Sequence, residues 1–278
     1  LLFLFPIVFV GYTGALPTWI YASFFLGAVL SITSIWWSMR NAKETPPTEE
    51  ELIALKASSS TIITPLKDIY EAVIEMPKIM WQLFLVYLFQ WFALMCYWQN
   101  NAKSMALSVW NTTPINKVEY ENAVEWNGLI GAFGFVVTFS VAFYLAKLAK
   151  KYSPKKVHFI CLALAGLAFL SFPIIQNQYV FFGIIIGYGI GWASMMGIPY
   201  LIIVDSIPKE RYGVYMGIIN MMIVIPMIIQ NLSFGYILKN FLDNDPRQAI
   251  TFAGVLLLVA ALLTLLIKSK KSIQVSNE

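Results

Sequence analysis

The chain has 278 residues, of which 59% are apolar and only 12% charged, and its formal net charge is +4 at pH 7. Soluble domains average about 25% charged residues, so this composition excludes an ordinary soluble protein and indicates one that lies in a bilayer. Cys96 and Cys161 both fall in apolar segments, so the sequence implies no disulfide framework.

Seven complete membrane spans are predicted, because a helix needs about 20 apolar residues to cross a bilayer. They lie near 16–37, 79–98, 126–147, 157–175, 180–203, 213–238 and 249–267. Residues 1–10 are apolar but too few to cross, and we interpret them as the end of an earlier helix. The sequence thus predicts an all-α polytopic membrane protein, expected to be a partial chain.

The basic residues predict how these spans are oriented, since cytoplasmic connections carry an excess of lysine and arginine. If the segment after residue 37 is cytoplasmic, 15 of the 19 basic residues fall on the inside, and the alternation holds through all seven spans. We therefore expect a multi-pass protein of the cell membrane, specifically the bacterial inner membrane, with the linker and the C-terminus cytoplasmic. The positive charge is then explained by the orientation of the chain in the lipid bilayer. We expect no nucleic-acid partner.

A hydrophilic segment, residues 41–78, divides the chain. Thr48 followed by Glu51 is typical of a capping box that starts a short helix. Farther on, apolar residues at helical spacing predict an amphipathic helix that lies on the membrane or on neighbouring loops. These residues are Leu66, Ile69, Val73 and Met76. The expected parts are the end of an N-terminal half (1–40), a cytoplasmic linker (41–78), a six-helix half (79–267) and a cytoplasmic tail (268–278).

Polar and aromatic residues repeat at helical spacing in the predicted spans. Gln90 and Tyr97 are seven residues apart on one helix face, and Trp91 and Trp98 share the adjoining face. Further stripes contain Asn127, Asn220 and Asn231. Such stripes bring amides toward a common interior, but small residues and amides also pack and hydrogen-bond between membrane helices. A tryptophan near the end of a span, such as Trp98, is also typical of an interface anchor.

The stretch YGIGWASMMGIPY, residues 188–200, combines three glycines, a proline and three aromatic residues inside a span. Tyr188 and Trp192 are one turn apart and present two rings on one face. Pro199 frees a backbone carbonyl, which is tolerated only where protein or cavity water satisfies it. Rings beside amides suit a ligand with apolar C–H faces and many hydroxyls, since each hydroxyl finds a partner. A sugar has this chemistry, although a nucleoside or a helix contact would use the same groups.

These patterns select the candidate site residues. The candidate substrate-binding residues are Gln90, Trp91, Tyr97, Asn127, Tyr188, Trp192, Asn220 and Asn231. The residues expected to permit bending or gating are Pro199, Gly213, Gly217, Pro226, Lys150, Lys151 and Lys155. No catalytic residue or metal ligand is expected, because the predicted spans contain no carboxylate. His158, the only histidine, is expected to have a structural role at the level of the lipid headgroups.

Two long stretches resemble a known family. Residues 75–98, EMPKIMWQLFLVYLFQWFALMCYW, resemble the seventh helix of the sucrose-transporter-like branch of the major facilitator superfamily, related to the glycoside-pentoside-hexuronide cation symporters. Residues 189–229, GIGWASMMGIPYLIIVDSIPKERYGVYMGIINMMIVIPMII, are similar to its tenth and eleventh helices. The resemblance implies a twelve-helix fold, of which this chain would cover the end of helix five through helix twelve.

The resemblance also implies a function, the transport of a disaccharide such as sucrose or maltose together with a proton, by alternating access. In that family the coupling residues lie largely in the N-terminal half, whose first helices would be the partner of this chain. The loop LAKLAKKYSPKKVH, residues 145–158, resembles a cytoplasmic motif between helices eight and nine, with lysines in place of the usual arginines. A non-transporting sensor or scaffold built on the same fold is the alternative, whereas a membrane enzyme would need acid-base or metal groups clustered at one depth.

Overall fold

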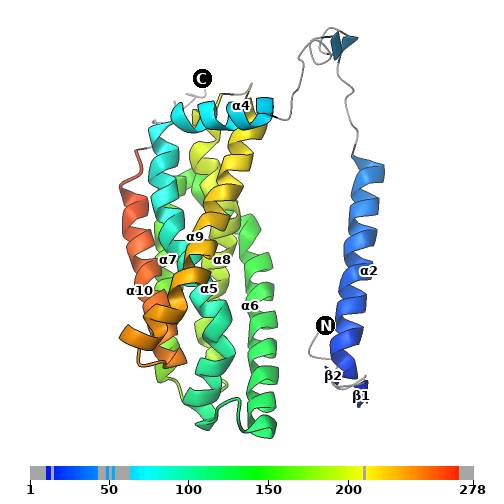
Figure 1. Cartoon of the computed structure of the whole chain (residues 1–278), viewed down its shortest axis with the longest axis vertical. Coiled ribbons are helices and arrows are strands. Elements are labelled where there is room, and N and C mark those ends of the chain that lie inside the picture. Colours follow the sequence, from blue (N-terminus) through cyan, green and yellow to red (C-terminus); the bar gives the residue numbers. More distant parts are fainter. Residues whose placement is uncertain are drawn as a thin grey trace. The chain divides into compact units, whose positions relative to one another are not determined.

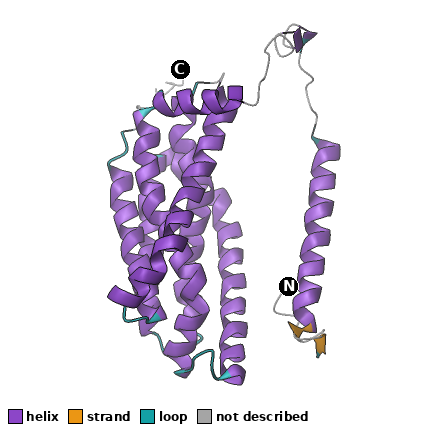
Figure 2. Cartoon of the chain, viewed as in Figure 1, coloured by secondary structure: helices purple, strands orange, loops and turns teal. Residues whose placement is uncertain are grey.

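The computed structural model describes residues 11–13, 16–42, 48–49, 52–53, 63–208 and 211–268. Its elements are labelled in Figure 1, and Figure 2 shows that helices account for nearly all of the described residues. The chain divides into two compact units, residues 1–68 and 69–278.

The first unit contains a short β pair followed by one long helix. Strand β1 (Tyr12–Thr13) pairs antiparallel with strand β2 (Leu16–Pro17), a detail that the sequence did not predict. Helix α2 (Thr18–Asn41) follows directly, and none of its side chains is buried. A helix that is apolar on all sides is typical of a membrane span. The two-residue strands leave the all-α class intact.

The second unit is a bundle of long helices (Figure 1). After α4 (Ile63–Ile74) come α5 (Lys78–Trp110), α6 (Lys117–Tyr152), α7 (Pro154–Ser171), α8 (Phe181–Ile203), α9 (Tyr212–Phe241) and α10 (Pro246–Leu265). The 3-10 turns η1 (Phe172–Ile174) and η2 (Val204–Ser206) extend α7 and α8. With α2, seven helices of the described part are long and apolar enough to cross a membrane, which confirms the seven predicted spans.

Helices α5 and α6 are longer than the spans predicted for them. Their 33 and 36 residues correspond to about 50 and 54 Å at 1.5 Å per residue, whereas the hydrocarbon core is about 30 Å thick. Both helices therefore project beyond the bilayer with polar turns that hydropathy does not mark. Asn111 closes α5 with a φ of 50°, in the left-handed region that asparagine tolerates.

The glycines of α8 permit close contacts with α6 and α7. A Cβ at Gly191 would lie 2.5 Å from the Cβ of Ala165 on α7, and a Cβ at Gly189 would lie 2.8 Å from the carbonyl oxygen of Gly134 on α6. The Thr138 hydroxyl on α6 also donates to the Gly189 carbonyl oxygen at 3.0 Å. These glycines therefore face neighbouring helices and not lipid.

Helix α4 confirms the predicted amphipathic helix, although its buried face differs slightly from the one predicted. Ala72 and Met76 are buried in the core of the second unit and Val73 packs against it, whereas Ile69 is 46% exposed. The buried face is thus rotated toward Ala72, which is fully buried. Glu51, the second half of the predicted capping box, lies outside the described residues.

Candidate substrate-binding surface

Side chains from α5, α7 and α8 form what we call the aromatic cluster. Its members are Trp91, Tyr97, Trp98, Phe169, Tyr188 and Trp192. The backbones of α5 and α8 approach each other at few points, and these rings occupy the space between them. The cluster brings together four of the predicted site residues, Trp91, Tyr97, Tyr188 and Trp192.

The rings of the aromatic cluster meet in the geometries that aromatic pairs prefer. Tyr97 stacks on Phe169 with ring centroids 4.3 Å apart and lies 5.0 Å from the ring of Tyr188. Trp192 meets Trp91 and Trp98 edge to face, at 5.9 and 5.6 Å. Each such pair contributes about 0.5–1.5 kcal/mol beyond the burial of its area, so the cluster is a rigid part of the bundle.

Only the outer members of the aromatic cluster are accessible. Trp91, Tyr97 and Tyr188 are each at most 5% exposed, whereas Trp98 is 37% exposed and Trp192 is half-buried. The indole N–H of Trp98 donates to the Tyr188 hydroxyl at 3.3 Å, which fixes the outer ring on the inner one. A ligand would therefore contact Trp98 and Trp192, supported from behind by the buried rings.

Three amides beside these rings join α5 to α9 and form what we call the amide cluster, Gln99, Gln230 and Asn231. The Gln230 side chain donates to Gln99 Oε1 at 2.9 Å, and the Gln99 side chain donates to Asn231 Oδ1 at 2.9 Å. Gln230 is fully buried, while Gln99 and Asn231 are exposed. Because Trp98 and Gln99 are consecutive on α5, the two clusters adjoin. Of these three residues the sequence analysis identifies only Asn231. Gln99 and Gln230 could have been found from the sequence because each is an amide next to apolar segments.

His158 is buried inside the bundle, and its hydrogen bonds give it a structural role, while its level relative to the lipid headgroups stays a prediction. It is fully buried, with Nδ1 2.8 Å from the Ser194 hydroxyl and Nε2 3.2 Å from Gln90 Oε1. Because α7 begins at Pro154, His158 is already in the second turn and faces α5 and α8. Gln90 is fully buried as well. His158 therefore joins α7 to α5 and α8 by hydrogen bonds, and neither His158 nor Gln90 reaches the surface of the bundle in this conformation.

A comparison with known protein families identifies the chain. A family model described as Major Facilitator Superfamily matches residues 2–230 and, in a second overlapping match, residues 128–277. The chain belongs to the Major Facilitator Superfamily. Together with the seven membrane-length helices, this makes it a membrane transporter. Comparisons with curated protein sequences and with solved structures give no significant match.

The remaining predicted amides of this facilitator lie outside both clusters. Asn127 is half-buried on α6 and Asn220 is exposed on α9. Among the described residues neither side chain has a hydrogen-bond partner. Their amides are thus available to a ligand, and their role in binding stays a prediction. Within the same ranges no three His, Cys, Asp or Glu side chains are placed to hold a metal ion.

The residues predicted to permit bending fall into two groups in the facilitator bundle. Pro199 and Pro226 are buried inside α8 and α9. Gly213 and Gly217, near the start of α9, are exposed, and a Cβ at either position would meet nothing within 4 Å. These two glycines do not serve a close contact among the described residues, unlike Gly191. Their role in bending stays a prediction.

The predicted gating lysines lie at the turn between α6 and α7. Lys155 Nζ donates to the Ile267 carbonyl oxygen at 2.9 Å, which satisfies a carbonyl just beyond the end of α10. Lys151 Nζ lies 5.1 Å from the ring centroid of Tyr152, and Lys150 is exposed. Lys155 therefore contacts the end of α10, and Lys151 contacts an aromatic ring. The role of the three lysines in gating stays a prediction.

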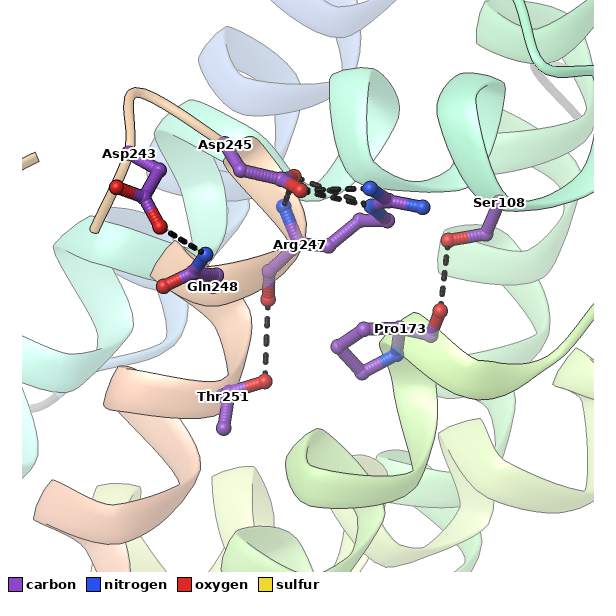
Figure 3. A network of polar contacts seen from close by, with 7 residues as sticks. All are labelled: Ser108, Pro173, Asp243, Asp245, Arg247, Gln248 and Thr251. Atoms are coloured by element: carbon purple, nitrogen blue, oxygen red, sulfur yellow. Dashed lines mark hydrogen bonds and ion pairs between the residues drawn. The ribbon is translucent and has the colours of Figure 1, made fainter.

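The turn between α9 and α10 carries the polar network in Figure 3. Asp245 caps α10 by accepting the backbone N–H of Arg247 at 2.8 Å, and it pairs with the Arg247 guanidinium at 2.7 Å. Partial burial raises the pKa of the Asp245 carboxyl, but the hydrogen bonds and charge of Arg247 outweigh this and hold it below its usual value. Nearby, the Ser108 hydroxyl donates to the Pro173 carbonyl oxygen at 2.9 Å and ties the end of α5 to η1.

Proposed function

We propose that this facilitator is a secondary active transporter of a sugar, a disaccharide such as sucrose or maltose, that moves its substrate with a proton. The junction of the two clusters on α5 is the observation that carries the proposal. There the accessible rings of Trp98 and Trp192 adjoin the exposed amides of Gln99 and Asn231. A pyranose ring offers an apolar face to an indole, while its hydroxyls both donate and accept hydrogen bonds as amides do.

The roles of the site residues follow from their exposure. Trp192 and Trp98 cover the apolar face of the sugar, and Asn231 and Gln99 bond its hydroxyls. Behind them, Trp91 and Tyr188 pack on these rings and Tyr97 packs on Tyr188, while Gln90 bonds His158 deeper in the bundle. Asn127 and Asn220 extend the polar wall from α6 and α9. Gln99 donates to Asn231, so the binding of a sugar would exchange this hydrogen bond for others.

Transport by this site would use alternating access. The bundle of residues 79–267 would form one wall of a central cavity, and the N-terminal helices of the same protein would form the other and rock against it. The protein would lie in the bacterial inner membrane, with a cytoplasmic linker that connects the two halves and a cytoplasmic tail. We infer proton coupling from the resemblance to cation symporters. The same resemblance relates the loop that contains Lys150, Lys151 and Lys155 to gating.

The test compares two single substitutions in the full-length protein reconstituted in proteoliposomes. Trp192→Ala removes one exposed ring of the site, and Trp81→Ala, a 49% exposed tryptophan near the start of α5, is the matched control. Uptake of radiolabelled sucrose and maltose is measured with and without an inward proton gradient. We expect Trp192→Ala to raise KM about tenfold, equivalent to ~1.4 kcal/mol, and to weaken uptake more than it lowers protein yield, and we expect Trp81→Ala to behave like the wild type.

Each outcome distinguishes the alternatives. Gradient-driven uptake of a disaccharide, lost with Trp192→Ala, supports the proposal. Uptake of a nucleoside and not of sugars would assign the same surface to a different solute. Absence of uptake for every solute, with binding retained, would indicate a sensor or scaffold. Equal loss of yield and uptake would show that Trp192 is a packing residue.

A further inference from the structure

A surface groove of the bundle lies apart from the clusters described above. It has a volume of about 530 Å³ and runs between α6 and α7 down to the edge of α8. Its walls are apolar, with Leu148 from α6, Ile160 and Leu164 from α7, and Ile190 from α8. The groove exists because α6 and α7 each pack closely on α8 but make few contacts with each other.

The groove has one polar end, formed by Tyr152 and Lys156 at the α6–α7 turn. From Lys156 the α7 wall extends to Leu164, about 12 Å along the helix, and from Tyr152 the α6 wall extends to Val141, about 17 Å. Half of the hydrocarbon core is about 15 Å thick. The groove therefore begins at the level of the headgroups and ends near the middle of the bilayer, which is the depth of one leaflet.

The polar end carries positive charge that nothing in the adjoining sequence neutralises. Five lysines lie in and beside it, and no Asp or Glu occurs between Glu125 and Asp205. They are Lys147, Lys150, Lys151, Lys155 and Lys156. Lys155 is committed to a backbone carbonyl oxygen, whereas Lys151 and Lys156 are exposed beside the groove. The excess of lysine on one side of a membrane explains the charge alone, but it does not explain an acyl-sized groove that opens at those lysines.

We propose that this groove binds an anionic phospholipid, with its phosphate at Lys151, Lys156 and the Tyr152 hydroxyl and one acyl chain between α6 and α7. The occupant follows from the combination of an apolar wall one leaflet deep with a basic mouth at headgroup level. A transported sugar would leave its hydroxyls unpaired along the apolar walls. The bound acyl chain fills the gap between α6 and α7, so the lipid helps to set the distance between these two helices.

The test uses the full-length protein in nanodiscs that contain phosphatidylglycerol with a photoreactive group on one acyl chain. Phosphatidylcholine with the same chain is the neutral probe. Labelled positions are mapped by peptide mass spectrometry. We expect phosphatidylglycerol to label residues 141–164 selectively, and phosphatidylcholine to label exposed helix faces evenly. On the unmodified protein, excess unlabelled phosphatidylglycerol should abolish the selective labelling, and the same excess of phosphatidylcholine should not.

Two variants separate the headgroup site from the acyl site. The double variant Lys151→Gln and Lys156→Gln should lower selective labelling about 25-fold, since each basic residue near the surface contributes roughly fivefold. Lys239→Gln, at the end of α9, is its control. Ile160→Trp should fill the groove and lower labelling with both lysines present, whereas Leu262→Trp on the exposed face of α10 should not. Equal labelling of the groove by both lipids, or labelling unchanged in the double variant, would overturn the proposal.

Discussion

Replacing Gly191 with alanine should destabilise the bundle, because the new methyl group would overlap α7. A Cβ at this position would lie 2.5 Å from the Cβ of Ala165, whereas two carbon atoms in contact prefer about 3.5–4.0 Å. Neither atom belongs to a flexible side chain that could turn away. The backbones of α7 and α8 must therefore separate by about 1 Å or more.

The magnitude follows from two opposing effects. Overpacking a well-filled contact costs about 1–3 kcal/mol, while alanine gains up to about 1 kcal/mol over glycine in helix propensity. With the full propensity gain the net loss is about 0–2 kcal/mol. The separation also strains the hydrogen bond between His158 and Ser194, which joins α7 to α8 at 2.8 Å. We therefore expect the loss to fall in the upper part of this range.

The assay is the midpoint of heat-induced aggregation of the detergent-solubilised protein, followed by size-exclusion chromatography. Gly197→Ala is the matched control, since Gly197 lies on the same helix, is exposed, and has nothing within 4 Å of an added Cβ. Gly191→Ala should lower the midpoint by several degrees, and Gly197→Ala should leave it unchanged or raise it slightly. Equal midpoints for the two variants would refute the assignment of Gly191 to a close contact.

Two further predictions concern buried and capping polar groups. Ser194→Ala should cost about 1–3 kcal/mol, because it leaves a buried nitrogen of His158 unpaired, and the midpoint should fall; Ser140→Ala, whose exposed hydroxyl bonds its own helix, should change it little. Asp245→Ala should cost about 0.5–2 kcal/mol by removing the cap of α10. Because the pKa of Asp245 is lowered in the folded protein, its stabilisation should be complete above the ordinary carboxyl pKa of about 4 and lost as pH falls through the lowered value. The stability difference between wild type and Asp245→Ala, measured from pH 7 to pH 3, should shrink accordingly.

The sequence predicted the spans well because hydropathy is a local property. Each of the seven apolar windows became a helix, and Pro77 and Asn111 delimit α5 as their backbone preferences require. The ends were less predictable for α5 and α6. The turns of α5 beyond its predicted span include the buried residues Ser104, Met105 and Ala106, a tertiary packing that a hydropathy window does not show.

The site was only partly predictable, because helical spacing shows which residues share a face but not what that face meets. Tyr188 and Trp192 were paired correctly by spacing, yet their contacts with Tyr97 and Trp98 depend on how α5 and α8 pack. His158 borders a lysine-rich turn, so its sequence position indicated the headgroups. Its burial against α5 and α8 is a tertiary contact that no local pattern encodes.

Helix α9 has a consequence for how the bundle deforms. Its start is tied by an exposed ion pair between Arg211 and Glu75 at 2.6 Å, and its second half is tied to α5 by the amide cluster. Between them Pro226 lacks the N–H that would close the helical hydrogen bond to the preceding turn. We therefore expect curvature to concentrate at this proline. Asn220 and Asn231 lie on opposite sides of Pro226 along α9. The distance between spin labels placed at these two positions would therefore change with the curvature of α9.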